Sequence, residues 1–365
     1  MCGKLLRVAV VGAGSIGREF ALQHFGPHTG TIVASIVDCN DDAAKALAMD
    51  TGSVLAGAQL SANGYGAQPS ETRGQPVPHA IALTDEVLSS CDAVYIGTTP
   101  AAHRDLVLQA LAADKHVLLE KPLAATAADA DAIVAAAEAA AVRGVHVSMN
   151  IGMRYNEALR VMRRRAVEDA TIGPLSSARL GLHFASWPRE WQQVAWCAGR
   201  ADGGPLREVG THFFFAIHEL FGHGCVRRVR ASVTFADDGD GGTLAEASAE
   251  GTIELNNGLS VELSLTTDGS VSMRRDLYHL EVVGAKGSLL LDAFTTLRAK
   301  VPRKKALVSN ADYGRTECVL ALAAAAAQRE PSGPRPVSVR EGRNAQRVLD
   351  ALLSSKGQWL DVEYA

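Results

Sequence analysis

Residues 5–17, LLRVAVVGAGSIG, decide the fold at the start of the chain, because an apolar strand-like run passes straight into a glycine-rich turn. The turn has the spacing G-x-G-x-x-G, formed by Gly12, Gly14 and Gly17, and the helix-forming run REFALQHF follows it. Gly12 permits a tight turn, Gly14 lets the backbone approach a pyrophosphate, and Gly17 lets helix and strand pack closely. Strand, turn and helix in this order predict a nucleotide-binding unit.

The helix after the turn begins at Ser15 and Ile16, where unpaired N–H groups and a partial positive charge attract phosphates. The next strand ends in Asp38, 21 residues after Gly17. An acid at this place accepts the ribose hydroxyls of a dinucleotide and repels a 2′-phosphate. Since no basic residue occurs in the following CNDD, we expect NAD as the cofactor, with NADP as the alternative. Cys39 directly follows the acid, so it lies near the cofactor or is a buried small hydrophobe.

The composition bounds the class of protein. The chain has 365 residues, enough for two domains, with 47% hydrophobic and 21% charged residues and a formal net charge of −4. Since there is no basic stripe, we expect no nucleic-acid partner. The alanine-rich runs near 132–142 and 321–327 are too short and too interrupted to span a bilayer, so we expect no membrane association.

The cysteines and the first residues of the chain indicate the cellular compartment in which we expect the protein. Six cysteines lie 28 or more residues apart without a C-x-x-C pair, which argues against a zinc knuckle and suits a reducing compartment. The first 30 residues hold the glycine turn rather than a signal peptide. We therefore expect a cytoplasmic protein.

Residues 1–150 alternate strand and helix, which predicts an α/β Rossmann domain with a doubly wound parallel sheet. The expected strands are 5–11, 32–37, 80–83, 93–97, 116–119 and 145–149. The expected helices are 15–26, 41–50, 101–113 and 126–143. Residues 52–78 are rich in Gly, Ser, Asn, Gln and Pro and do not continue the alternation of strands and helices. We interpret them as an inserted surface loop or hairpin, which is either a lid or a tolerated insertion.

From residue 151 the pattern changes, which predicts a second, α+β domain over 151–365, built on a mainly antiparallel sheet. The expected helices are 155–169, 204–221, 312–328 and 340–355. The expected strands are 175–184, 226–235, 246–255, 259–267, 277–283 and 287–292. Turn sequences such as NNG and TDG separate several of these strands, so successive strands should pair antiparallel and leave one face of the sheet free.

Three strands of the first domain end in polar residues at one edge of the predicted sheet. Ligands of open parallel sheets bind outside the carboxyl ends of the strands. We therefore expect the cofactor to contact Thr98, Thr99, Pro100, His103, Glu120, Lys121 and Asn150. Lysine rarely tolerates the end of a buried strand unless it is paired or functional, which favours a chemical role for Lys121.

Four short segments carry a resemblance to a known family. They are TPAAH at 99–103, EKPLA at 120–124, GGPLREVGTH at 203–212 and GAKGSL at 284–289. Together with the glycine turn they resemble the Gfo/Idh/MocA family of NAD(P)-dependent oxidoreductases, including its D-x-G-x-H segment and its late sheet motif. The resemblance implies hydride transfer between a nicotinamide and a secondary alcohol or ketone of a sugar, cyclitol or related polyol.

The resemblance also implies catalytic roles for three residues. Lys121 would touch the nicotinamide and the reacting oxygen, His212 would exchange the proton of that oxygen, and Glu208 would orient the histidine. The spacing agrees, because residues four apart share a helix face, where a carboxylate can hold an imidazole and raise its basicity. The family's usual residue at 208 is Asp, so the longer Glu208 moves this contact or the histidine.

Aromatic and arginine residues are candidates for the small-molecule substrate. Arg154 and Tyr155 follow the crossover between the domains, where the resemblance implies a substrate-contacting Arg–aromatic pair. Trp187, Arg189 and Trp191 precede the segment of His212 and can stack on a sugar ring and bind hydroxyls or a carboxylate. An oligomer contact is an equal alternative, since we expect a homo-dimer or homo-tetramer through the C-terminal sheet.

The sequence also contains a segment similar to a zinc-binding motif, and two alternative functions are compatible with the residues described above. HELFGH at 218–223 resembles H-E-x-x-H, but its histidines are five apart, about 140° around a helix, and Gly222 should end that helix, so we expect no metal. A dinucleotide-binding regulator or sensor without turnover is the first alternative, and the presence of both Lys121 and His212 argues for an enzyme instead. A dehydrogenase of dihydrodiol or imine-like substrates is the second, and it differs only in the pocket.

Overall fold

The computed structural model describes residues 4–62, 74–192, 194–237, 242–271, 275–301, 303–309 and 313–364. The chain divides into two compact units, which we treat separately. Unit 1 comprises Met1–Ala124, Ala128–Asn150 and Arg315–Val339, and unit 2 comprises Ala125–Ala127, Ile151–Gly314 and Arg340–Ala365. The chain therefore leaves unit 1 after residue 150 and returns to it at residue 315.

Unit 1 is built on a parallel sheet that has, among the described residues, six strands in the order β3-β2-β1-β4-β5-β6. The strands are β1 (Leu6–Val11), β2 (Thr31–Val37), β3 (His79–Ala80), β4 (Ala93–Ile96), β5 (His116–Leu119) and β6 (Val147–Met149). The strand order reverses between β1 and β4, which makes the topological switch point of a doubly wound fold. The predicted Rossmann sheet is thus confirmed.

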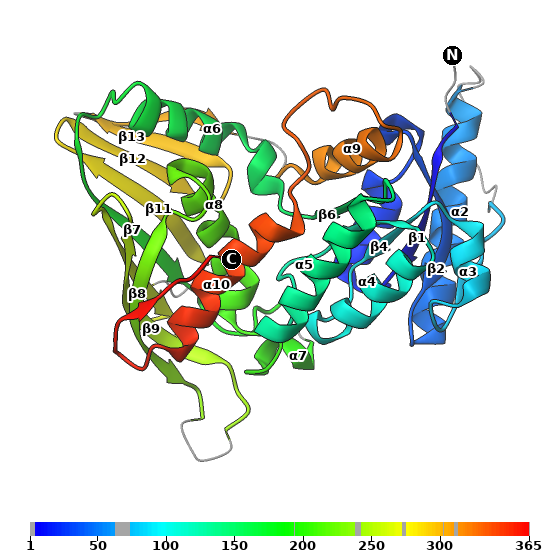
Figure 1. The fold of residues 1–365 in the computed structure, drawn as a ribbon, viewed down its shortest axis with the longest axis horizontal. Helices are drawn as coiled ribbons and strands as arrows, with labels where there is room; N and C mark the ends of the chain where they lie inside the picture. Colours follow the sequence, from blue (N-terminus) through cyan, green and yellow to red (C-terminus); the bar gives the residue numbers. More distant parts are fainter. Residues whose placement is uncertain are drawn as a thin grey trace. The chain divides into compact units, whose positions relative to one another are not determined.

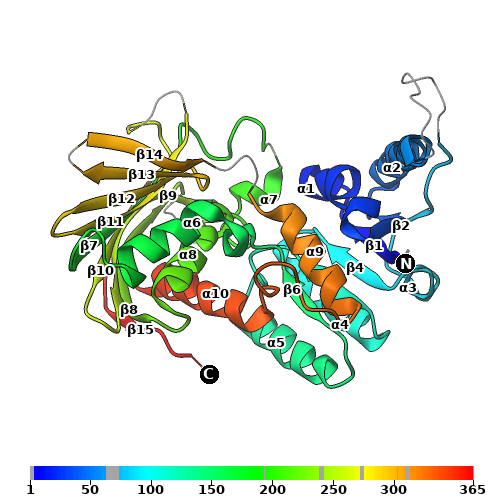
Figure 2. The same cartoon turned by 90° about the horizontal axis from the view of Figure 1, so that it is seen from above.

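Helices cover both faces of this sheet, which explains why its strands read as continuous apolar runs. Val8, Val10 and Val94 have no exposed surface. Helices α1, α2 and α9 lie on one face and α3, α4 and α5 on the other (Figure 2). Their bounds are α1 (Ser15–Glu19, continued by the π-helix η1, Phe20–His24), α2 (Asp41–Ala62), α3 (Asp85–Ser90), α4 (His103–Ala112), α5 (Ala127–Ala141) and α9 (Arg315–Ala326).

The insertion predicted at 52–78 is wrong in its first part, because α2 continues to Ala62. Buried residues at helical spacing carry the helix past the expected end: Ala44, Leu47, Ala48 and Thr51. Gly52 does not break the helix. It lets the returning chain pass, since a Cβ there would lie 2.0 Å from the carbonyl oxygen of Gln75. Residues 63–73 of the predicted insertion lie outside the described residues.

Unit 2 contains a sheet that has, among the described residues, nine strands in the order β14-β13-β12-β11-β7-β10-β9-β8-β15. The strands are β7 (Leu175–His183), β8 (Val226–Phe235), β9 (Glu246–Leu255), β10 (Ser260–Thr266), β11 (Leu277–Gly284), β12 (Gly287–Asp292), β13 (Thr296–Val301), β14 (Arg303–Ser309) and β15 (Leu360–Asp361). Neighbours pair antiparallel except for the parallel pair of β7 and β10, so the mainly antiparallel sheet is confirmed. Strands β13 to β15 were not predicted.

One face of this sheet is covered by the helices α6, α8 and α10 (Figure 1). They are α6 (Glu157–Arg163, continued by the π-helix η5, Arg164–Glu168), α8 (Thr211–Phe221, preceded by the π-helix η6, Leu206–Gly210) and α10 (Val339–Ser354). A further short helix is α7 (Ala195–Ala198). Three consecutive residues of α8, Phe213, Phe214 and Phe215, have no exposed surface, so this helix is buried on all sides. Truncation of one such ring to Ala costs about 3–5 kcal/mol.

Residues 315–339, which lie within the predicted second domain, 151–365, are part of the compact unit 1. Helix α9 in this segment contacts β5 and β6. Its buried residues Cys318, Val319 and Leu322 form the apolar stripe that packs there.

Among the described residues, no helix combines the length and apolar character that a bilayer span requires.

Candidate active site

The glycine turn of unit 1 has the geometry that its spacing predicts. Gly12 has a φ of +104°, and a Cβ there would lie 2.5 Å from the carbonyl oxygen of Gly97. A Cβ on Gly17 would lie 1.8 Å from the oxygen of Gly12, so neither position accepts a side chain. Gly14 differs, because it is exposed and a Cβ there would meet nothing within 4 Å. Its missing side chain leaves the backbone open to a ligand.

Asp38 lies beside this turn at the end of β2. Its Oδ2 accepts a hydrogen bond of 2.7 Å from the backbone N–H of Ala13, and its Oδ1 accepts one of 2.8 Å from that of Asn40. Each carboxylate oxygen keeps a second lone-pair direction for a ribose hydroxyl. Ser15 is exposed and Ile16 half-buried at the start of α1. Cys39 is exposed, so the reading of it as a buried hydrophobe is wrong.

Glu120, which follows β5, forms hydrogen bonds with residues at the carboxyl ends of two other strands, β4 and β6. Tyr95 of β4 donates its hydroxyl to Glu120 Oε1 at 2.9 Å, and Asn150, after β6, donates its side-chain N–H to the same oxygen. The backbone N–H of Lys121 donates to Glu120 Oε2 at 3.2 Å. Glu120 is 7% and Asn150 5% exposed, while Lys121 is half-buried. The carboxylate thus holds the segment of Lys121 at the sheet edge.

The side chain of His103 was predicted to contact the cofactor, and the structure contradicts this, because the residue has no exposed surface. Its Nδ1 lies 3.1 Å from the carbonyl oxygen of Pro122 and its Nε2 lies 3.3 Å from that of Thr98. Burial lowers the pKa of His103 to about 4, so the ring is neutral at pH 7. His103 connects the loop after β4 to the loop after β5. In the first loop Thr99 is half-buried and Pro100 buried.

In unit 2, His212 and Glu208 lie on consecutive helical segments, and both are largely buried, at 8% and 7% exposure. Nδ1 of His212 lies 2.5 Å from the hydroxyl oxygen of Tyr313. Glu208 Oε2 accepts a hydrogen bond of 3.1 Å from Gln192 Nε2. Tyr313 and Gln192 were not among the predicted site residues. Tyr313 is 101 residues from His212, and no sequence pattern connects them.

The predicted substrate residues Trp187, Arg189 and Trp191 come together in unit 2. The guanidinium of Arg189 lies 4.7 Å from the ring centroid of Trp191 and 5.2 Å from that of Trp187. Its Nε donates to Gln192 Oε1 at 3.2 Å, and Gln192 in turn bonds Glu208. Trp191 is 64% exposed, so its ring offers a surface for stacking. These residues are thereby linked to the segment that holds His212.

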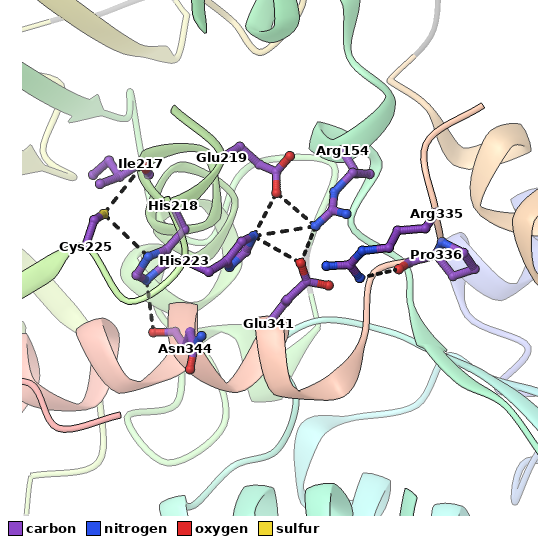
Figure 3. Close-up of polar contacts among 10 residues, drawn as sticks. All are labelled: Arg154, Ile217, His218, Glu219, His223, Cys225, Arg335, Pro336, Glu341 and Asn344. Carbon is purple, nitrogen blue, oxygen red and sulfur yellow. Dashed lines mark hydrogen bonds and ion pairs between the residues drawn. The ribbon is translucent and has the colours of Figure 1, made fainter. Parts of the chain in front are cut away.

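The contacts of Arg154 in unit 2 indicate a structural role, and its predicted contact with substrate stays a prediction (Figure 3). Its side chain is 9% exposed, and its Nη2 lies 2.6 Å from Glu341 Oε1 and 2.9 Å from Glu219 Oε1. Two carboxylates thus hold the guanidinium that was expected to bind substrate. The contacts connect the short helix η4 (Gly152–Tyr155) to α8 and α10. The other predicted substrate residue of this segment, Tyr155, is half-buried.

The zinc-like motif contributes to this ionic cluster. Among the described residues, Glu219, His223 and Glu341 form a group whose ligand atoms lie within 4.8 Å of one another. Arg154 Nη2 lies 3.5 Å from His223 Nε2, so a protein cation already stands among these atoms. His218, the first histidine of the motif, points elsewhere, since it is fully buried with Nε2 3.3 Å from the carbonyl oxygen of Asn344.

A Rossmann sheet with a bare glycine turn, an acid at the end of β2 and a lysine at the sheet edge defines the nucleotide-binding part of an NAD-linked oxidoreductase. Residues 6–149 match the oxidoreductase family with NAD-binding Rossmann fold. Residues 164–362 match the C-terminal alpha/beta domain of the same family. The chain therefore belongs to the Gfo/Idh/MocA oxidoreductase family, and its cofactor is NAD, with NADP possible.

Comparison with individual proteins gives more distant matches. The 1,5-anhydro-D-fructose reductase of Ensifer adhaerens is 30% identical over 208 residues, which are 56% of this chain and 54% of that protein. Inositol 2-dehydrogenase of Paracoccus denitrificans is 32% identical over 170 residues, which are 47% and 44% of the two chains. The matches thus span about half the length of these relatives. The crystal structure of an oxidoreductase domain protein from Kribbella flavida, 20% identical, has a TM-score of 0.75 over 99% of this chain and 100% of that one. This similarity shows the same fold.

Proposed function

We propose that the protein transfers hydride between NAD and a secondary alcohol or ketone of a sugar, cyclitol or related polyol. The observation that carries the proposal is Lys121, a half-buried lysine held by buried Glu120 at the edge of an NAD-binding sheet. The family supports the reaction class. The names of the relatives, a reductase of a sugar derivative and a dehydrogenase of a cyclitol, support the substrate class.

The residues of unit 1 fit NAD. The exposed Gly14 leaves room for a pyrophosphate against the turn, and Asp38 presents a carboxylate whose two oxygens are fixed by backbone N–H groups. When bound, NAD supplies the hydride acceptor or, in its reduced form, the donor. Asp38 binds the ribose hydroxyls and disfavours a 2′-phosphate, which makes NAD the preferred cofactor.

The proton of the reacting hydroxyl has to leave or arrive as hydride moves. In the proposal, the Lys121 ammonium group hydrogen-bonds the reacting oxygen and stabilises the negative charge that develops on it. His212 exchanges the proton of this oxygen through Nε2, since its Nδ1 is bonded to Tyr313. Glu208 supports the segment of His212 through its hydrogen bond from Gln192.

The substrate specificity is proposed to come from the aromatic–arginine cluster of Trp187, Arg189 and Trp191. A sugar or cyclitol ring has an apolar C–H face that stacks on an exposed indole. The exposure of Trp191 supports this role. Arg189, which is held by Gln192, adds a donor for ring hydroxyls or a carboxylate.

We further propose a cytoplasmic homo-dimer or homo-tetramer that pairs through the free face of the unit 2 sheet. Alternate residues of β7 and β10, such as Arg179 and Glu262, are exposed on that face, whereas Leu180 and Leu263 are buried on the other. The cysteines of the described part of the chain, Cys39, Cys91, Cys197, Cys225 and Cys318, are free thiols, as in a reducing compartment. Light scattering coupled to gel filtration measures the oligomeric state directly.

The test of the proposed activity is a screen of the purified protein with NAD and NADH. NADH fluorescence is followed against sugars, cyclitols and their keto forms, with dihydrodiols and cyclic imines as additional arms. We expect turnover with at least one ring polyol or its ketone. Turnover of a dihydrodiol or imine alone would replace the substrate class. NAD binding without turnover of any compound, in either direction, would favour the regulator instead.

A further inference from the structure

Tyr95, in strand β4 of unit 1, is a buried tyrosine whose ring is fixed by its neighbours. The residue has no exposed surface. Its ring stacks on that of Phe20, with 4.5 Å between centroids and an interplanar angle of 18°. Gly97 leaves space for the ring, because a Cβ there would lie 2.6 Å from Cε1 of Tyr95 and 2.9 Å from its hydroxyl oxygen. The packing therefore determines where the hydroxyl group lies.

The hydroxyl group of Tyr95 donates to Oε1 of Glu120 at 2.9 Å. A carboxylate only accepts hydrogen bonds, so the phenol is the donor. Burial and the neighbouring Glu120 raise the pKa of Tyr95 well above its usual value, so the phenol keeps its proton. The side-chain N–H of Asn150 donates to the same oxygen. Two buried donors thus hold Oε1 of Glu120.

The other oxygen of this carboxylate bonds the backbone of Lys121. Oε2 of Glu120 accepts the N–H of Lys121 at 3.2 Å. The terminal torsion of a glutamate side chain is broad, so a carboxylate without fixed partners turns readily. The donors on Oε1 set the plane of the carboxylate and thereby direct Oε2 to Lys121. On the other side of Lys121, Nδ1 of His103 lies 3.1 Å from the carbonyl oxygen of Pro122.

We propose that Tyr95 is a positioning residue for Lys121 and that its hydroxyl group acts through the carboxylate of Glu120. The inference deepens the proposed function and rests on it for the chemical role of Lys121. The lysine side chain extends from a backbone that Glu120 holds, so loss of the Tyr95 hydroxyl lets this backbone shift. A displacement of a reacting group by about 1 Å can lower a rate about 100-fold. Tyr95 is buried, so it supports the reaction without contacting the substrate.

The first measurement needs no substrate. The exchange of the Lys121 N–H with solvent deuterium, followed by NMR, reports its hydrogen bond to Glu120. In Tyr95→Phe we expect this exchange to become about tenfold faster or more, because a hydrogen bond to a charged group is lost. The N–H of Glu120, which donates to the carbonyl oxygen of Ile96 at 3.0 Å, should exchange as before. Unchanged exchange of the Lys121 N–H would overturn the proposal, whatever the activity.

Two further variants support this measurement. Ser35→Ala is the matched control, because it removes a buried hydroxyl of β2 whose oxygen has no hydrogen-bond partner among the described residues. It should leave the exchange of the Lys121 N–H unchanged, and an equal acceleration in Ser35→Ala would overturn the proposal. Glu120→Gln removes the charge on which the phenol acts and should also accelerate this exchange. It serves in place of Tyr95→Phe if that variant does not fold, and unchanged exchange in Glu120→Gln would overturn the proposal too.

The second measurement is kinetic. Tyr95→Phe should lower kcat by about 10–100-fold, with KM changed less. In a protein that already carries Glu120→Gln, the same change should lower kcat by about twofold or less, because the phenol acts through the carboxylate. An equal further loss of kcat in both backgrounds would mean an independent packing role and overturn the proposal. Faster exchange of the Lys121 N–H with unchanged kcat would uphold the positioning and instead contradict the role of Lys121 in the proposed function.

Discussion

Asp38 and Ala13 are joined by a hydrogen bond of 2.7 Å from the Ala13 N–H to Oδ2 of the carboxylate. This bond fixes the acid against the glycine turn before any ligand arrives. The same carboxylate receives the N–H of Asn40 at 2.8 Å. Because both oxygens are held, the direction of their remaining lone pairs toward a ribose is set by the fold.

Asp38→Ser is therefore expected to weaken NAD binding by about 10–100-fold, the value of hydrogen bonds to a charged group. Binding of NADP should weaken less or improve, because a negative charge near the 2′-phosphate is removed. Fluorescence titration with NADH and NADPH measures both. Asp42→Ser, a change at an exposed acid in the same part of the chain, is the control. Equal weakening for both dinucleotides in Asp38→Ser would show that the acid does not select between them.

The fold of unit 1 was predictable because the strands β1, β4 and β5 are largely buried and therefore read as apolar runs. The end of α2 was not, because Gly52 and its neighbours look like loop residues in sequence. Only the structure shows that the segment of Gln75 packs against Gly52 so closely that there is no space for a side chain there. Strands β13 and β14 were missed although Leu297, Ala299 and Val301 of β13 alternate with Arg298 and Lys300, which is the pattern of a strand with one polar face.

The candidate site was predictable where one segment carries the information, as in the glycine turn and in Glu120-Lys121. It was not predictable where distant segments supply a partner. Arg154 is held by Glu341, 187 residues away in sequence, and His212 meets Tyr313 at a separation of 101. Charge and burial at such contacts are properties of the folded chain alone.

Arg154→Met tests whether Arg154 stabilises the fold through its ion pairs. Removal of the guanidinium takes one cation away from the half-buried Glu219 and the buried Glu341, which should cost about 3–5 kcal/mol of unfolding free energy. Urea denaturation measures this. Arg160→Met, which removes an exposed arginine paired with Glu157, should cost about 1 kcal/mol or less. A stable Arg154→Met protein with a strongly raised KM would restore the substrate-binding role.

Glu246 gives a prediction for neutral and alkaline pH. Burial raises the pKa of Glu246 from 4.5 to about 7, and its carboxylate lies where a Cβ on Gly204 would be, 2.0 Å from Oε2. The folded state therefore binds this proton more tightly, and stability falls as pH rises from about 4.5 to about 7. Glu246→Gln should stabilise the protein above pH 7, by on the order of 3 kcal/mol if the shift is fully expressed.

The measurement for Glu246 is Tm against pH. The gain of Glu246→Gln over the unaltered protein should be large at pH 8 and small at pH 5. Glu262→Gln, at an exposed position of β10, is the control and should show no such trend. A gain in Glu246→Gln that is the same at both pH values would contradict the assignment of a protonated, buried acid.

The buried His103 should make the protein less stable as the pH falls, which is the opposite of the trend expected from Glu246. Its pKa falls from 6.5 to about 4 on burial, so the unfolded chain binds the proton more tightly and stability is lost as pH falls from about 6.5 to 4. In urea denaturation, His103→Asn should be less stable than the unaltered protein at pH 7, and its stability should decline less between pH 6.5 and 4. An equal decline in both proteins would mean that His103 does not contribute to acid destabilisation.

Lys121→Ala provides the most direct test of hydride transfer at the sheet edge, with turnover and NADH affinity measured on the same preparation. We expect that turnover of the substrate found in the screen falls by about a thousandfold or more, since a group that stabilises the reacting oxygen is lost, while NADH still binds. Lys115→Ala, at the opposite end of strand β5, should keep full activity. Undiminished turnover in Lys121→Ala, with Lys115→Ala equally active, would contradict the role of Lys121 in hydride transfer.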